Sequence, residues 1–267
     1  MQQASLLDPR DSILLREIAN SYTALRRYAE AEAYYVRSLA LVPDDFEAVA
    51  QRATSTMLSG DLEGADRILA AVPPTSDPQG SISLVRFRLA MIQRQPDKAL
   101  TVIAQSPDWL MTRWEHSVVP INLLRAQALA MKGESGPARA AFLAAEKQLQ
   151  ERLKDPAQVT DANSYLGLVY AGLGQKEPAL KAGRVAVESM PMSRDVIVGA
   201  FQLERLARTE AQVGDVQSAV QHLDQLMSSA GGETVSFPSL RIDPAWDAIR
   251  ADARFQALVE KFSPTVK

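Results

Sequence analysis

The stretch Ser12–Asp45 reads SILLREIANSYTALRRYAEAEAYYVRSLALVPDD, and it decides the fold. Within it, Ala19 and Ala31 stand twelve residues apart, so that one small residue falls on each of two consecutive helices. Small side chains allow two antiparallel helices to cross closely. The stretch therefore predicts a helical hairpin that packs through this pair.

The same spacing recurs along the chain. Four more pairs of small residues keep it, and one pair keeps it with a large first member: Ala53 and Ala65, Ala126 and Ala138, Gly167 and Ala179, Ala207 and Ala219, and Phe87 and Ala99. Helix-breaking residues separate the members of four pairs: Ser59-Gly60-Asp61, Gly133-Glu134-Ser135, Gly174-Gln175 and Gly214-Asp215. Six hairpins in sequence predict a stacked array in which each unit packs on its neighbours.

The distance from unit to unit is also informative. Ala31, Ala65 and Ala99 follow one another at one constant interval. The later intervals, from Ala99 through Ala138 and Ala179 to Ala219, are all several residues longer. We expect the extra residues to form a longer connection at 106–119 and longer second helices after it.

This pattern resembles the tetratricopeptide repeat, a helix–turn–helix unit of about 34 residues with small and aromatic residues at fixed positions. The constant interval from Ala31 to Ala65 and Ala99 equals the length of that unit. The first unit agrees with the family pattern at Leu15, Ile18, Ala19, Tyr22, Ala31, Tyr35, Ser38 and Pro43, and the fifth agrees at Leu166, Gly167, Tyr170, Ala179, Ala186 and Pro191. The resemblance implies an all-α, right-handed α-solenoid of about six helical hairpins. The expected units lie near 12–45, 46–79, 80–118, 119–159, 160–199 and 200–233, followed by a C-terminal cap at 234–267.

The beginning of the chain resembles the end of a repeat. Pro9 precedes Pro43 by the same constant interval, and Leu7–Asp11 parallels Leu41–Asp45. We therefore expect residues 1–11 to be the end of a preceding repeat helix, which makes this chain a part of a longer protein. A short native helix at the N-terminus is the alternative.

The C-terminal region predicts a cap. Asp243 precedes Pro244, which is the order of a capping carboxylate and a proline at the first helical position. A helix follows, and we expect Trp246 and Phe255 to cover the last exposed helix face. A repeat array needs such a cover at its end.

The same region carries a second resemblance. Together with Gly183–Glu188 and Met190–Asp195, the segment Leu240–Arg250 is similar to the C-terminal tetratricopeptide module of certain bacterial regulators. Their effector domain is a serine/threonine kinase, an adenylate cyclase or a winged-helix transcription factor. The resemblance implies a sensory or docking module that binds a protein or peptide and serves an upstream effector domain.

Composition narrows the function classes. The formal net charge of −3 argues against direct binding of nucleic acid, which needs a basic face. The chain has no cysteine, so disulfides and thiolate metal sites are excluded. No apolar run in this sequence is long enough to span a bilayer. The compartment stays open: cytoplasmic, or periplasmic if the full-length protein is membrane-anchored.

The residues that could carry catalysis are few. His116 and His222 have no partner at metal-ligand spacing, and Gly172-Leu173-Gly174 has no preceding strand to make it a phosphate loop. The carboxylates at Asp44-Asp45 and at Asp243 and Asp247 stand at helix starts, where capping explains them. We expect no catalytic residue, no metal and no cofactor, and therefore no enzyme.

The concave face is the candidate binding surface. In the tetratricopeptide family the first helix of each unit lines this face, and the family positions point here to five residues: Arg16, Asn20, Arg88, Gln127 and Arg208. Arg16 and Asn20 lie one helical turn apart and resemble the carboxylate clamp with which some members grip a peptide C-terminus. The alternative is that they are solvated groove residues with no fixed ligand.

The insertion at 106–119 contains Trp109 and Trp114. An aromatic-rich loop of this kind is either a partner-binding edge or a plug between the third and fourth units, and we favour the plug. Two alternatives to the docking module also remain. One is a freestanding assembly or oligomerisation scaffold, and the other is a small-molecule sensor that uses the groove.

The groove assignment predicts the behaviour of a triple variant. Replacing Arg16, Asn20 and Arg88 with alanine should weaken binding of the partner, because the donors that fix a peptide are removed. Helicity by circular dichroism and the melting temperature should stay unchanged. Equal binding by the variant and the wild type contradicts the assignment.

Overall fold

The computed structural model describes residues 10–73, 77, 80–104, 106–112, 117–229 and 232–264, most of them in helices. Twelve helices form six antiparallel hairpins: α2 (Ser12–Ala24) with α3 (Tyr28–Leu41), α4 (Phe46–Ser59) with α5 (Leu62–Ala70), α6 (Ser81–Ile92) with α7 (Pro96–Ile103), α8 (Ile121–Met131) with α9 (Ser135–Arg152), α10 (Val159–Gly172) with α11 (Lys176–Ser189), and α12 (Val196–Gln212) with α13 (Val216–Ser228). The predicted all-α solenoid is confirmed. Residues 1–9, which carry most of the expected preceding helix, lie outside the described residues.

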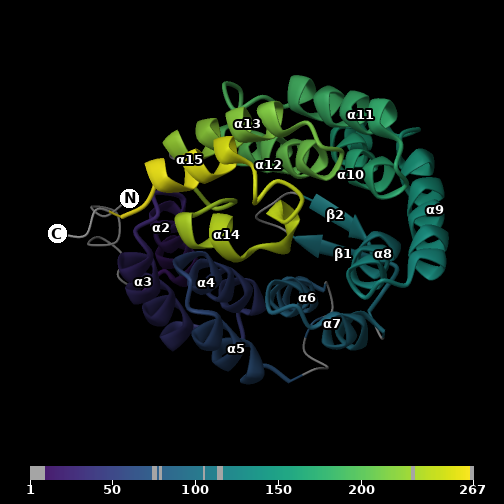
Figure 1. Cartoon of the computed structure of the whole chain (residues 1–267). Helices are drawn as coiled ribbons and strands as arrows, with labels where there is room; N and C mark the ends of the chain where they lie inside the picture. Colours follow the sequence, from purple (N-terminus) through teal and green to yellow (C-terminus); the bar gives the residue numbers. More distant parts are fainter. Residues whose placement is uncertain are drawn as a thin grey trace.

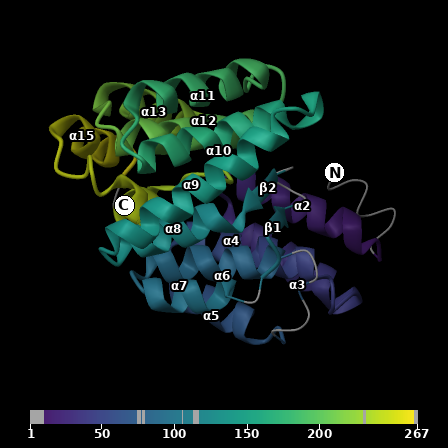
Figure 2. The same cartoon turned by 90° about the vertical axis from the view of Figure 1, so that its right-hand side faces the viewer.

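The hairpins follow one another around a common centre (Figure 1). The first helix of each hairpin faces this centre, and the second helices form the outer layer. Figure 2 shows the same array from the side, with α15 at one end of the central axis and the two strands towards the other. The array therefore bends far enough to bring its first and last hairpins together.

The alanines that the sequence places at the hairpin contacts are all buried. Each alanine of the six pairs is at most 4% exposed. At the glycine of the fifth pair, Gly167, an added Cβ would lie 3.3 Å from the carbonyl oxygen of Ala179, its partner twelve residues on. This position shows why the first and second helices can approach so closely, and why the second member of each pair is always alanine.

The expected longer second helices after the third unit are present relative to the second and third units. The second helices α9, α11 and α13 have 18, 14 and 13 residues, whereas α5 and α7 have 9 and 8. Only α9 exceeds α3, which has 14 residues. The sixth hairpin also has a longer inner helix, because α12 has 17 residues.

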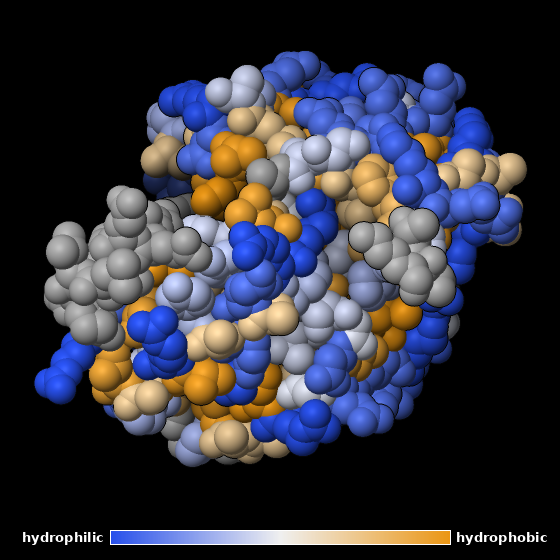
Figure 3. Space-filling view, turned by 90° about the vertical axis from the view of Figure 1, so that its left-hand side faces the viewer, coloured by the Kyte–Doolittle hydropathy of each residue, from blue (hydrophilic) through white to orange (hydrophobic). Residues whose placement is uncertain are grey.

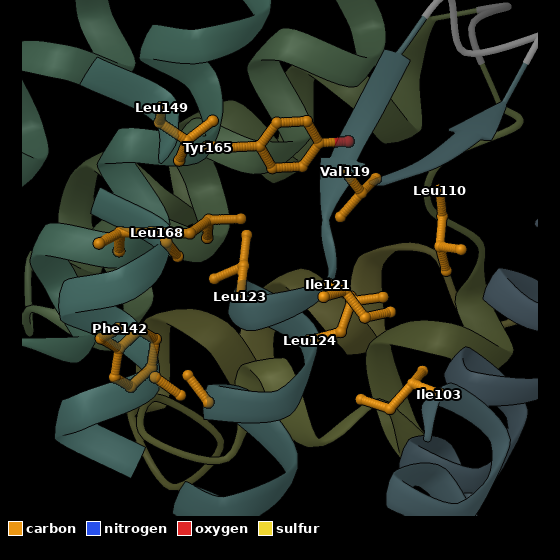
Figure 4. Packing of buried hydrophobic residues seen from close by; sticks show 14 of the residues in the cluster. Ile103, Leu110, Val119, Ile121, Leu123, Leu124, Phe142, Leu149, Tyr165 and Leu168 are labelled. Carbon is orange, nitrogen blue, oxygen red and sulfur yellow. The ribbon is translucent and has the colours of Figure 1, made fainter. Parts of the chain in front are cut away.

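A β-hairpin occupies the insertion between the third and fourth units. Strands β1 (Trp109–Thr112) and β2 (Ser117–Pro120) pair antiparallel, with Leu110 opposite Val119. Both side chains are buried and point towards Ile121 and Ile103 of the neighbouring helices (Figure 4). The described part of the insertion is thus a plug. The sequence indicated no strand because four residues are too few for an alternating pattern; Trp114 and His116 fall outside the described residues.

The C-terminal region consists of α14 (Phe237–Ile242), a short 3₁₀ helix η2 (Pro244–Trp246) and α15 (Ala253–Lys261). Trp246 and Phe255 are each 1% exposed and belong to one apolar cluster with Leu203 of α12 and Leu223 of α13. The predicted cap is confirmed, as is the capping role of Asp243, whose carboxylate accepts from the backbone N–H of Ala245 at 2.9 Å.

Contacts between the two ends of the array close it into a ring. The backbone N–H of Gly232 donates to the carbonyl of Ala24, at the end of α2, over 2.8 Å. Arg26 lies in the turn between α2 and α3. Its guanidinium donates to three carbonyls: Leu226 at 2.8 Å, Ser229 at 2.8 Å and Val235 at 3.2 Å. Two of these lie at the C-terminal end of α13, where a helix has unpaired carbonyls and attracts a positive charge. Burial lowers the pKa of Arg26 from its ordinary value.

Figure 3 looks at the side where the first and last hairpins meet. Apolar and hydrophilic residues alternate over this face. In the first hairpin, Ile13 is 60% exposed, Leu25 52% and Val36 46%.

The Arg26→Gly variant tests the ring closure. Glycine tolerates the left-handed conformation of this turn, so the change removes the side chain without backbone strain. Loss of three hydrogen bonds from a charged donor should lower the free energy of unfolding in urea by about 2 kcal/mol. Arg184→Ala, on the exposed face of the outer helix α11, is the control and should leave the stability unchanged. A stability of Arg26→Gly equal to that of the control contradicts the assignment.

Candidate functional site

A cavity of about 490 Å³ lies at the centre of the ring. Its walls come from the inner helices α4, α6, α8, α10 and α12, from Phe142 of α9, from Val119 of β2, and from the C-terminal region between Glu233 and Ala248. Apolar side chains form most of the wall, among them Leu84, Phe87, Met91, Leu124, Phe142 and Leu168. A volume of this size and an apolar lining with a few polar groups are typical of ligand-binding pockets.

Three of the five predicted binding residues line this cavity: Arg88 of α6, Gln127 of α8 and Arg208 of α12. Residues from three hairpins that are distant in sequence are thus brought to one cavity. Arg208 is already engaged within the chain. It bridges Glu204, one turn away on α12, and Asp243 of the C-terminal region at 2.8 Å. Burial alone would lower the pKa of Arg208, but the two carboxylates outweigh it and raise that pKa.

Arg16 and Asn20 do not line the cavity. The guanidinium of Arg16 binds the carboxylate of Asp45, at the start of α4, over 2.8 Å. The side-chain oxygen of Asn20 accepts a hydrogen bond from the hydroxyl of the buried Tyr35 at 2.7 Å. The structure thus gives both residues partners within the first hairpin and its neighbour. It does not bring them to the other three predicted residues, and their part in binding stays a prediction.

One segment, Glu233–Arg250, closes the cavity on the side of α14, and we call it the closing segment. Its Asp247 receives both terminal nitrogens of Arg94, from the turn after α6, at 2.7 and 2.9 Å. Hydrogen bonds from Arg94 lower the pKa of the Asp247 carboxyl. Arg250 braces the segment from within by donating to the carbonyl of Asp243 at 2.7 Å. The sequence analysis did not identify Arg94 and Arg26 as site residues. Each occupies a turn position that is glycine in the other four hairpins, and this difference could have identified them.

A buried polar network joins the β-hairpin to the inner helices. Arg205 of α12 is 4% exposed, donates to the hydroxyl of Ser117 at 3.1 Å, and lies 3.8 Å from a carboxylate oxygen of Asp161. Its guanidinium stacks on the ring of Tyr165 at 4.5 Å, and the Tyr165 hydroxyl bonds Ser117 in turn. In Figure 4 the hydroxyl of Tyr165 points towards β2. Burial raises the pKa of the Asp161 carboxyl, and the charge of Arg205 opposes that rise. The network fixes the plug at one end of the cavity.

The remaining candidates for chemistry have structural partners. Nδ1 of His222 lies 2.8 Å from a carboxylate oxygen of Glu210, which is 1% exposed. Asp45 caps α4 by accepting from the backbone N–H of Ala48. Within the described ranges, no three carboxylate, imidazole or thiol side chains gather as a metal site would require. In the same part of the chain, no helix has the length and apolar character needed to cross a bilayer.

A second depression, of about 1060 Å³, lies between the outer helices α3 and α5. Its wall includes the ion pair between Arg52 and Glu32 and the N-terminal cap of α5, Asp61. None of the predicted binding residues reaches it. The central cavity is therefore the better candidate site.

Comparison with known proteins supports the repeat assignment for the first hairpin. Residues 14–49, which span it, match the family model described as tetratricopeptide repeat. Among solved structures, one similar chain is PilW, described as a widely conserved type IV pilus biogenesis factor. It is 19% identical, with 80% of this chain and 91% of that chain covered and a TM-score of 0.45. No curated protein matches the sequence.

The Arg205→Met variant tests the buried network. It removes the nearest cation from the buried Asp161 carboxylate and leaves only the weaker influence of Arg152, so the free energy of unfolding at neutral pH should fall by about 3 kcal/mol. Because the pKa of Asp161 is raised, its carboxyl takes up a proton as the pH falls, and the neutral group no longer needs a cation. The loss of unfolding free energy in the variant should therefore become smaller at lower pH. Urea unfolding at several pH values measures both effects. Arg184→Met, on the exposed face of α11, is the control. A loss that does not depend on pH contradicts this pairing.

Proposed function

We propose that this chain, an all-α solenoid with a tetratricopeptide repeat at residues 14–49, is a binding scaffold for a protein or peptide. The observation that carries the proposal is the central cavity. Inner helices of five hairpins form it, and its wall combines apolar side chains with Arg88, Gln127 and Arg208. Apolar side chains of a peptide can be buried there, while the polar groups orient its backbone.

In the fuller form of the proposal, the scaffold is the sensory or docking module of a larger bacterial signalling protein. Support comes from the resemblance of Gly183–Glu188, Met190–Asp195 and Leu240–Arg250 to the C-terminal modules of such regulators. Binding in the cavity would then be passed to an effector domain upstream of residue 1. An open reading frame that encodes a kinase, cyclase or DNA-binding domain upstream would support this form, and a stop codon there would contradict it.

A small-molecule sensor is the second candidate, and one observation favours it. The closing segment and β2 border the cavity on two sides, so that a compact ligand fits more easily than a long peptide. A thermal shift with metabolites, without a bound peptide, would identify this case.

A peptide library tests the leading proposal. Random peptides displayed on phage are selected on the immobilised chain, and the affinities of enriched peptides are measured by fluorescence polarisation. Gln127→Trp places a large ring in the cavity wall and should weaken their binding at least about ten-fold, or about 1.4 kcal/mol.

The matched control is Gln221→Trp, the same substitution on the exposed face of the outer helix α13. It should leave the affinity unchanged. Enriched peptides that bind Gln127→Trp as tightly as the wild type would show that the cavity is not the binding site.

A further inference from the structure

The six hairpin turns are not equivalent. Their central residues occupy corresponding positions and all have a positive φ. Four are glycine, with φ between 75° and 96°, and two are arginine, Arg26 and Arg94, each with φ of 57°. Residues other than glycine seldom adopt this left-handed conformation, and they persist in it where surrounding contacts compensate. The two arginines therefore need a reason for their positions.

Both arginines reach the C-terminal part of the chain. Arg94 binds Asp247 with two parallel hydrogen bonds, and Arg26 donates to carbonyls between Leu226 and Val235. A third arginine, Arg208, binds Asp243 and lies over the ring of Trp246 at 5.3 Å. Three hairpins thus supply one guanidinium each to hold the last segment of the chain. Two of the three guanidinium groups bind aspartates that flank Trp246.

The closing segment therefore occupies the concave face in the way that a bound peptide would. Two aspartates and a tryptophan, within Asp243–Asp247, provide the recognised groups, and Asp243 and Asp247 line the cavity. The pair of Arg94 and Asp247 is open to solvent, with side chains 53% and 41% exposed. Exposed ion pairs stabilise weakly, so this contact can be exchanged for another carboxylate.

We propose that this arginine-bearing surface binds an acidic segment of a partner protein, with carboxylates on both sides of an aromatic residue, in exchange for the chain's own Asp243–Asp247. The inference rests on the proposed function, since it names the partner of the same cavity. An exchange replaces each contact with a similar one. The partner has to overcome mainly the high local concentration of the tethered segment.

A peptide supplied in trans tests the exchange. The probe is a fluorescein-labelled synthetic peptide with the sequence of Leu240–Arg250, and the full chain carries Asp243→Asn and Asp247→Asn. This chain has lost both carboxylate contacts in cis but keeps all three arginines. The peptide should bind it at least ten-fold more tightly than it binds the wild type. A peptide with asparagine at both aspartate positions is the control and should bind at least ten-fold more weakly.

The role of Arg94 is tested in the same chain. Adding Arg94→Gly introduces the residue found in four of the six turns, so the backbone keeps its conformation while the guanidinium is lost. Peptide affinity should fall about ten-fold. Equal affinity for the wild type and the double variant, or affinity indifferent to Arg94→Gly and to the control peptide, would overturn the proposal.

If the double variant does not fold, hydrogen exchange in a single variant tests the displacement instead. Asp247→Asn alone alters only the exposed contacts of this carboxylate with Arg94 and Arg250. In this variant the backbone amides from 243 to 252 should exchange hydrogen faster when the peptide is added. Unchanged exchange at saturating peptide refutes the displacement. The same measurements distinguish the proposed function from this inference. If library peptides lose affinity for Gln127→Trp but never speed exchange in the closing segment, the cavity function stands and this inference fails.

Discussion

Every hairpin depends on the contact between two residues twelve positions apart. Because the second of them is always alanine, the two helices approach so closely that a Cβ added at Gly167 would lie 3.3 Å from the carbonyl oxygen of Ala179. Larger apolar side chains are then directed to the faces between hairpins, where only a neighbouring hairpin can bury them. The end of the array must therefore be covered. Trp246 and Phe255 cover the last hairpin, and the hydrogen bonds of Arg26 join the first hairpin to it.

This closure changes what the concave face can do. In an open solenoid the inner helices line a continuous groove. Here the closing segment crosses it, and the β-hairpin limits it from another side, leaving a cavity of about 490 Å³. The network of Arg205, Asp161 and Ser117 holds the β-hairpin in place through buried charges, whereas an exposed ion pair holds part of the closing segment. The β-hairpin is thus a fixed wall of the cavity, whereas the closing segment is a wall that a partner segment can replace.

Local pattern was enough to predict the hairpins, the terminal cap and the capping role of Asp243, because each depends on residues close in sequence. Closure was not predictable in this way, since Arg26 bonds carbonyls 200 to 209 residues away. Arg88 and Gln127, which the family positions named, line the cavity, whereas Arg16, named in the same way, forms an ion pair with Asp45. Family positions alone could not show this difference. The sequence analysis did not predict the two strands, because four residues are too few to show an alternating pattern.

The closing segment is held unevenly, and this decides how it could open. At one end Arg26 donates to the carbonyl of the buried Val235, and towards the other end Trp246 and Ile249 lie in an apolar cluster, each 1% exposed. At the other side Asp247 binds Arg94 in contact with solvent. Coulomb attraction between exposed groups is screened by water and salt, whereas burial of a tryptophan is not. A competing carboxylate therefore gains access first at Arg94, and the tryptophan leaves its site only when another aromatic side chain can replace it. A partner must supply both groups, which makes the exchange selective for acidic segments with an aromatic residue.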